Sequence, residues 1–222
     1  MLQEVDENNV SYKEFLHKIL EEECKLKEIL KFNLRLKNAN LPSIKKLEDF
    51  DTSFQPAISK KKIKILSEMD WVDRLFKIIF LGPPGTGKSH MCISLGYEAV
   101  LKGYRVAFST MNELMYILKT RHTSQKSKVK YNRIINSQLW LLDEVGYTPV
   151  TREEANLFFQ LIAELDEKVA MVITSNKGFA DWTEFLGDPA LATAVLDRLS
   201  FRCEIFNLTG KSYRLEHRNN LF

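Results

Sequence analysis

Hydrophobic and polar residues follow two different patterns along this chain of 222 residues. Up to about residue 37, apolar side chains recur every three or four positions, which predicts an amphipathic helix or a pair of helices. Ser11 and Glu14 have the spacing of a capping box, so we expect the helix to begin directly after Ser11. Its polar face carries three glutamates at 21–23 beside several lysines. That face is typical of a solvated surface over a small helical pack, or of a surface that binds a partner.

The region after this helix has a different character. Pro42 breaks the helical pattern, because the residue before a proline avoids the helical conformation. Residues 43–56 read as a connector, and we expect its two phenylalanines, Phe50 and Phe54, to be buried. Ser59 is then placed to cap a basic helix that follows it directly.

From residue 77 onward, short apolar segments alternate with longer helical ones. The expected strands cover residues 77–81, 105–109, 139–143, 170–175 and 203–208. The expected helices run from the end of the first strand to about 102, from about 112, from a capping box at 151 to about 166, and over 189–199. Alternation of this kind indicates a parallel sheet with crossover helices.

The pattern as a whole predicts an α/β fold, a three-layer sandwich around a central parallel sheet. We divide the chain into a helical amino-terminal region (1–42), a connector with a basic helix (43–76) and the α/β core (77–222).

Composition narrows the class of protein. Apolar residues make up 45% of the chain and charged residues 27%, as in ordinary globular proteins, and the net charge of +3 is only a weak hint of an acidic partner. The three cysteines lie far apart and form no CxxC pair, which argues against a zinc knuckle or a disulfide framework. The first residues are acidic, unlike a secretory signal, and no apolar run reaches the ~20 residues of a membrane span. We therefore expect a cytoplasmic protein.

One motif carries strong chemical information. GPPGTGKS, from Gly82 to Ser89, matches GxxxxGK[ST] and lies between an expected strand and an expected helix. Its glycines let backbone N–H groups turn toward phosphates, Lys88 supplies a positive charge, and the Ser89 hydroxyl is a ligand for Mg²⁺. The sequence thus predicts a site for ATP and Mg²⁺. Its nucleotide-binding residues are Gly82, Pro83, Pro84, Gly85, Thr86, Gly87, Lys88, Ser89 and the adjacent His90.

Two further strand ends carry polar residues. Asp143 and Glu144 follow the apolar run LWLL, and parallel sheets present their chemistry at this end of the strands. Adjacent side chains in a strand point to opposite sides, so we expect Asp143 to hold Mg²⁺ and Glu144 to activate the attacking water. Asn176 ends the next strand and is positioned to orient that water. The alternatives are a plain surface acid pair and an ordinary turn residue.

The window between Glu113 and Asp143 contains no acidic residue. Six positive charges in this window are plausible contacts to the phosphate backbone of duplex DNA, with little sequence preference. The alternative is a solvated helix and loop. The candidate DNA-binding residues are Lys119, Arg121, Lys126, Lys128, Lys130 and Arg133.

Several of these motifs also occur together in a known family. The chain carries LEDFDTSFQP, IIFLGPPGTGKSHMCISLGYEAVLKGYRV, LWLLDEVGYTP, MVITSNKGF, GDP, LDRL and GKSYRL. Together they resemble the AAA+ ATPases and, within these, the IstB-like proteins, ATP-binding helpers of transposition that are related to DnaC-type helicase loaders. The resemblance covers about residues 11–218 and includes motifs outside the general ATPase core.

The resemblance implies functions that the residues alone do not. It implies an ATPase whose ATP promotes formation of a homo-oligomer on duplex DNA, which recruits or activates a transposase. Arg198 of the LDRL motif then looks like an arginine finger for the nucleotide of a neighbouring subunit, with Arg202 and Arg214 as weaker candidates. Only 46 residues follow Asn176, so we expect no carboxy-terminal lid domain. The amino end looks shorter than in many members.

Two other functions compete with this interpretation. A DnaC-type helicase loader acting in DNA replication shares the ATPase core; some loaders have a cysteine cluster near the amino terminus, where this chain has only Cys24. A small-molecule P-loop kinase needs a substrate pocket and a closing lid, for which the tail is too short.

Overall fold

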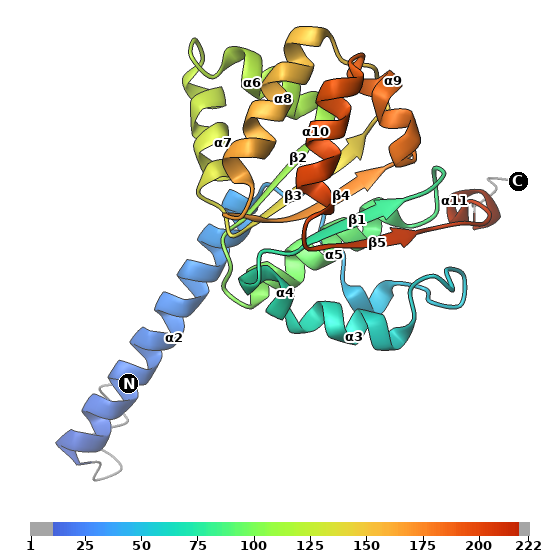
Figure 1. The fold of residues 1–222 in the computed structure, drawn as a ribbon. Helices are drawn as coiled ribbons and strands as arrows, with labels where there is room; N and C mark the ends of the chain where they lie inside the picture. The colour runs from blue at the N-terminus through green and yellow to red at the C-terminus, as the bar shows by residue number, and fades with distance from the viewer. Residues whose placement is uncertain (1–10, 218–222) are drawn as a thin grey trace, which may run out of the picture.

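The structure is a computed structural model that describes residues 11–217. Its centre is a parallel sheet with the strand order β2-β3-β4-β1-β5 (Figure 1). The strands are β1 (Lys77–Leu81), β2 (Val106–Thr110), β3 (Leu139–Val145), β4 (Ala170–Ser175) and β5 (Cys203–Asn207). All strand pairs are parallel, and helices cover both faces, which confirms the predicted fold class.

Successive side chains of each strand point to opposite faces of the sheet and pack into two separate hydrophobic cores. Ile79 of β1 and its like-facing neighbours pack with one set of helices, whereas Ile78 and Phe80 face the opposite set. The first set comprises α6 (Met111–Thr120), α8 (Arg152–Leu165), α9 (Trp182–Leu186) and α10 (Pro189–Ser200). The second comprises α3 (Lys60–Glu68), α4 (Asp70–Asp73) and α5 (Lys88–Leu101). Helices on both faces leave β1 to β4 buried almost throughout, whereas β5, one of the two edge strands, is mostly exposed.

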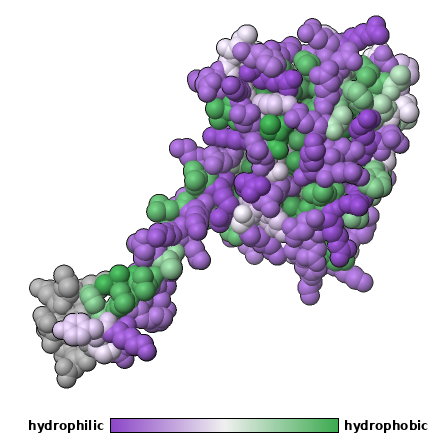
Figure 2. Space-filling view, turned by 60° about the vertical axis from the view of Figure 1, so that its left-hand side comes forward, coloured by the Kyte–Doolittle hydropathy of each residue, from purple (hydrophilic) through white to green (hydrophobic). Residues whose placement is uncertain are grey.

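The helix at the start of the chain is single and projects from the body. It is α2 (Tyr12–Ala39), with the predicted capping box at Ser11 and a left-handed Asn40 at its end. Only its last turns pack against α5 and β2, and the rest of the helix stands away from the body (Figure 1). Several of its apolar side chains are exposed, Leu30 to 67%, and Figure 2 shows apolar residues on the surface of the projecting helix. Among the described residues there is no small helical pack around it, so that expectation was wrong.

The basic stretch before β3 contains a helix that the pattern did not predict, α7 (Gln125–Ile135). The Ser124 hydroxyl caps it by accepting a hydrogen bond from the N–H of Ser127. Of its residues only Ser127 and Ile134 are fully buried, and Tyr131 and Ile135 pack partly buried beside them, so its apolar stripe is short. Its identity as a helix therefore depends on the cap and on packing against α6.

The predicted cap of α3 by Ser59 is present, and the strand boundaries differ from the prediction by one or two residues. Between residues 11 and 217, no helix is both long and apolar enough to cross a lipid bilayer. The division at residues 42 and 76 stays a prediction.

Candidate functional site

The phosphate-loop motif connects β1 to α5 at the carboxyl edge of the sheet. Gly87 stands directly before α5 with φ at +97°, a conformation that L side chains rarely adopt. A Cβ atom at this position would lie 2.8 Å from the ring of Phe50. Both the backbone angle and the close approach of the connector therefore require glycine here.

Lys88 is held in this loop by the loop's own carbonyl groups. Its Nζ donates hydrogen bonds to the backbone oxygens of Gly82 at 2.7 Å and Pro83 at 2.8 Å. Burial lowers the pKa of Lys88 to about 8; the charge of Arg214 also lowers it, whereas Asp143 raises it. A phosphate group close to this amine would raise the pKa again and favour the charged form, so the loop is adapted to an anionic ligand.

Asp143 is joined to the loop and to the neighbouring strand by hydrogen bonds. The Ser89 hydroxyl donates to Asp143 Oδ1 at 3.0 Å. The hydroxyl of Thr174, on β4, donates to the same carboxylate oxygen. The Thr174 oxygen in turn accepts from the backbone N–H of Glu144 at 3.0 Å. Asp143 is only 6% exposed, so this network fixes a buried carboxylate next to the phosphate loop.

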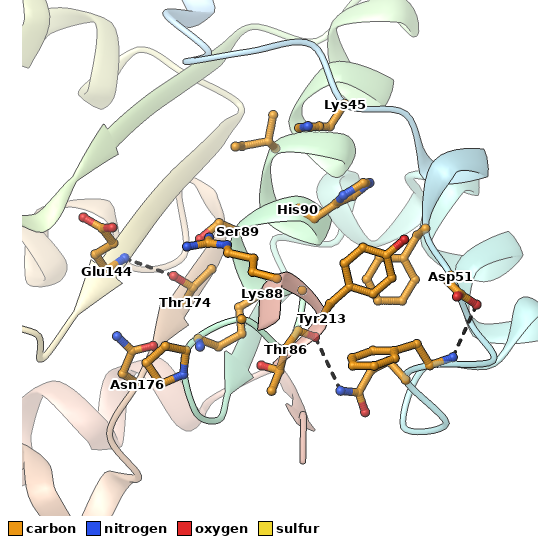
Figure 3. Close-up of a pocket in the computed structure, with 18 of the residues that line it drawn as sticks. Lys45, Asp51, Thr86, Lys88, Ser89, His90, Glu144, Thr174, Asn176 and Tyr213 are labelled. Carbon is orange, nitrogen blue, oxygen red and sulfur yellow. Dashed lines mark hydrogen bonds between the residues drawn. The ribbon is translucent and has the colours of Figure 1, made fainter. Parts of the chain in front are cut away.

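Glu144 takes a different orientation from Asp143 because the strand is irregular at this point. The pairing of β3 with β4 shifts between Leu142 and Val145, and Glu144 has φ at +67°. Its side chain is exposed and lines a cleft of about 710 Å³ above the phosphate loop. Asn176 lines the same cleft, since β4 is hydrogen-bonded directly to β1. Figure 3 shows Glu144, Thr174 and Asn176 on one side of Lys88 and Ser89.

Aromatic side chains form the opposite side of the cleft. The Phe50 ring lies 5.6 Å from the ring of His90, and the Phe54 ring lies 5.1 Å from that of Tyr213. Contrary to expectation, the two phenylalanines are only half-buried, because both line the cleft; Phe50 also packs against the edge of the core. In Figure 3, His90 and Tyr213 lie on this side, across Lys88 from Glu144 and Asn176.

The sequence did not predict the part played by the carboxy-terminal tail. A short helix, α11 (Tyr213–Glu216), brings Arg214 into the cleft, and the N–H of Tyr213 donates to the Gly85 oxygen at 3.0 Å. Gln55 of the connector donates hydrogen bonds to the backbone oxygen of Thr86 in the phosphate loop and to that of Thr209 in the tail, so it joins all three segments. A lone Gln in the connector and one Arg in a polar tail carry no readable signal of these contacts.

Arg198 and Arg214, both candidates for a finger toward a neighbouring subunit, occupy different places. Arg214 lies at the phosphate loop of its own chain. The backbone oxygen of Arg198 accepts a hydrogen bond at 2.9 Å from the Nζ of Lys77, the first residue of β1, and Arg198 does not line the cleft of its own chain. Its guanidinium stacks on the ring of Phe159 at 4.8 Å. Arg202, beside it in sequence, contacts the Arg74 oxygen.

The six basic residues between α6 and β3 are not all free of counter-charges. Lys119 forms an ion pair with Glu154 of α8 at 2.7 Å, and Lys130 pairs with Glu113. The expectation of six uncompensated charges was therefore wrong, because the fold brings in acids from outside that window. Arg121 stacks on Tyr131, and the three that remain exposed without an ion pair in residues 11–217 are Lys126, Lys128 and Arg133.

With the geometry established, comparison with known proteins identifies the family. The family model described as "IstB-like ATP binding protein" matches residues 1–220. The chain belongs to this family. A Pseudomonas aeruginosa relative, named as an ATP-binding protein of insertion sequence IS21, is 40% identical over 218 residues, covering 98% of this chain and 82% of the relative.

Solved structures support the same fold at lower identity. DnaI superposes with a TM-score of 0.62 at 16% identity, covering 74% of this chain and 91% of DnaI. The DnaC helicase loader gives a TM-score of 0.55 at 19% identity, covering 78% and 97% respectively. These likenesses show the fold alone. Membership of the family makes this chain an ATP-binding protein, and its fold is of the AAA+ type.

Proposed function

We propose that this protein hydrolyses ATP in the presence of Mg²⁺, assembles on duplex DNA as a homo-oligomer when ATP is bound, and in that state assists a transposase. The observation that carries the proposal is the divided acid pair: Asp143 is fixed against Ser89, while Glu144 is free in the cleft. A protein that only stores nucleotide has no use for the second carboxylate in this position.

Mg²⁺ fits the residues present. The Ser89 hydroxyl and the Asp143 carboxylate are 3.0 Å apart at the edge of the phosphate loop, and both offer the hard oxygen ligands that Mg²⁺ prefers. No cluster of three or more His, Cys, Asp or Glu side chains that suits a metal occurs within residues 11–217. Ser89 and Asp143 would hold the ion from the protein side, with phosphate oxygens and water as its other ligands, as is usual for Mg²⁺ with nucleotides. The ion neutralises phosphate charge when bound.

The chain's own residues divide the remaining work of hydrolysis. Glu144 accepts the proton of the attacking water, and Asn176, from the neighbouring strand end, holds that water in line. Lys88 stabilises charge on the phosphates from within the loop. The aromatic side, with Phe50 and Tyr213, receives the adenine ring.

The positions of the arginines support a site completed by a second subunit. Arg214 provides positive charge within the same chain, whereas Arg198 does not line the cleft of its own chain. As the last-turn residue of α10 it remains half-exposed and is available to a neighbouring subunit. ATP bound between two subunits then couples nucleotide binding to assembly.

Names of relatives favour transposition over helicase loading. The relative at 40% identity is named for an insertion sequence, whereas the likeness to the DnaC helicase loader, at 19% identity, concerns the fold. The exposed Lys126, Lys128 and Arg133 supply a surface for duplex DNA, with contacts to the backbone instead of the bases.

Thr174 provides a test of the hydrolytic geometry. Thr174→Val keeps the shape of the side chain but removes the hydroxyl that joins Asp143 to the backbone of Glu144. We expect ATP turnover to fall about tenfold or more, with ATP affinity within about threefold, because a hydrogen bond to a charged group is worth about 1.5–3 kcal/mol. Thr174→Ser should restore turnover. The exposed Thr193→Val is the matched control, and equal turnover in both valine variants would remove Thr174 from the account.

The DNA surface is tested by titrating a duplex of arbitrary sequence with protein, ATP and Mg²⁺ at several salt concentrations. The double variant Lys126→Ala, Lys128→Ala should bind more weakly, with the slope of log affinity against log salt reduced by about two. The control, Lys60→Ala with Lys61→Ala, removes the same charge from α3. Binding that ignores salt, or that drops equally in both variants, would refute a dedicated surface on α7.

A further inference from the structure

A second cleft, of about 330 Å³, lies outside the ATP site. It is formed where the last turns of α2, the start of β2 and the carboxy-terminal half of α7 meet (Figure 1). Three arginines line it: Arg35 of α2, Arg105 directly before β2 and Arg133 of α7. The other polar lining residues are the asparagines Asn38, Asn132 and Asn136, and no lining residue is acidic.

The three guanidinium groups lack the carboxylate partners that such a cluster normally has. None of them takes part in an ion pair with any residue of the described chain from 11 to 217. The Nε of Arg35 is fully buried and has no hydrogen-bond partner there. Arg105 uses its Nε to donate to the Asn136 oxygen at 3.0 Å, which fixes the plane of its guanidinium. Guanidinium groups remain charged at all ordinary pH values, so the cleft concentrates positive charge.

An oxyanion is the ligand that this arrangement complements. Arginine offers a planar set of N–H donors that matches phosphate in a bidentate manner, and none of these three arginines has a carboxylate partner within residues 11–217. The asparagine side chains add uncharged hydrogen-bonding groups beside them.

The surroundings favour nucleic acid over an isolated carboxylate. Lys126 stands seven residues before Arg133 on α7, and the two share one helix face; Lys128 stands on the row that continues through Asn132 and Asn136. Both lysines are exposed and unpaired within the described chain. From Lys126 to Arg133 this basic face of α7 is about 10 Å long and ends in the cleft. Along the axis of a DNA duplex that length corresponds to about three phosphates of one strand.

We propose that Arg35, Arg105 and Arg133 form a receptor for one phosphate of the duplex DNA backbone, at the end of the lysine row on α7. The contact rests on the proposed DNA-binding function and adds α2 and β2 to its surface. It anchors DNA at the root of the projecting helix, where α2 packs against β2.

The test compares charge-removing variants in the presence of ATP and Mg²⁺, with a duplex of arbitrary sequence as the probe. Arg35→Gln with Arg105→Gln should weaken DNA binding about tenfold at ~0.15 M salt and reduce the salt slope by about one, the value for one lost phosphate contact. ATP affinity should not change, because neither residue lines the ATP cleft. Lys60→Gln with Lys61→Gln removes two charges from α3 and serves as the control.

The outcomes separate this contact from the general proposal. If the arginine variant binds DNA as the control does, while Lys126→Ala with Lys128→Ala binds weakly, the arginine receptor is overturned and the DNA function stands. That result is also expected if a protein carboxylate occupies the cleft. If the wild-type chain binds no duplex, both proposals fail. Should the arginine pair variant lose ATP binding through misfolding, the exposed Arg133→Gln decides: unaltered DNA affinity and salt slope overturn the receptor.

Discussion

Glu144→Gln is expected to bind ATP with an affinity within about twofold of the wild type, and to hydrolyse it at least about a hundredfold more slowly. Glutamine is close in size and keeps the left-handed backbone at no extra strain, since Glu144 already has φ at +67°. It cannot accept a proton from water, and a general base contributes typically 10²–10⁴-fold to rate. Steady-state phosphate release, together with equilibrium binding of ATP, measures the two effects separately.

The control for this variant is Glu153→Gln, which alters an exposed glutamate in the first turn of α8. It should leave both quantities unchanged. Undiminished turnover in Glu144→Gln would reject Glu144 as the base, and another group in the cleft would have to activate the water.

Arg198→Ala is expected to reduce turnover of the assembled protein by about 10³-fold, at the lower end of the effect of an arginine finger. ATP affinity of an isolated subunit should not change, because Arg198 does not line the cleft of its own chain. The same change removes the stacking on Phe159, so thermal unfolding is measured alongside turnover. If turnover falls while the unfolding temperature is unchanged, the loss is due to the missing positive charge and not to a damaged fold.

Mixing subunits shows whether Arg198 acts across an interface. Arg198→Ala supplies an intact phosphate loop, and Lys88→Ala supplies an intact arginine, so some mixed interfaces contain both. We expect partial recovery of hydrolysis. The matched control mixes Arg198→Ala with the double variant Lys88→Ala, Arg198→Ala, which has no intact arginine to offer. If the subunits are well folded and neither mixture recovers hydrolysis, Arg198 does not act in trans.

The central chemistry was predictable because its residues are contiguous and stand at strand ends. Gly82–Ser89 and the Asp143-Glu144 pair each follow an apolar run, and the fold class then places all the carboxyl ends at one edge. The left-handed backbone of Glu144 was not predictable, since it arises from a register shift between two strands. Nor was Thr174, whose hydroxyl is significant only because β4 adjoins β3.

Long-range contacts explain the predictions that were wrong. Lys119 and Glu154 are 35 positions apart, so the window around Lys119 showed no acid although the folded protein supplies one. Phe50 reads as a core residue, but its ring packs against the glycine of the phosphate loop and closes one side of the cleft. An apolar pattern indicates that a side chain leaves water, and does not distinguish a core from the wall of a binding site.

The same limit applies to α2. Its apolar spacing predicts a helix correctly, yet Leu16, Leu30 and other apolar residues of that helix are exposed. Of its apolar side chains, only Phe32, Leu36 and Ala39 pack against the core of the body. Helical periodicity fixes which residues share a face, but the partner of that face is set by tertiary structure.

The mass of the protein in solution, with and without ATP, tests most directly the claim that ATP completes a site between subunits. Light scattering on Glu144→Gln, which holds ATP without consuming it, should give the monomer mass alone and a multiple of it with ATP and Mg²⁺. Duplex DNA should favour the larger form, and Lys88→Ala should remain monomeric throughout. A single unchanged mass in all these conditions, with ATP demonstrably bound, would contradict the account.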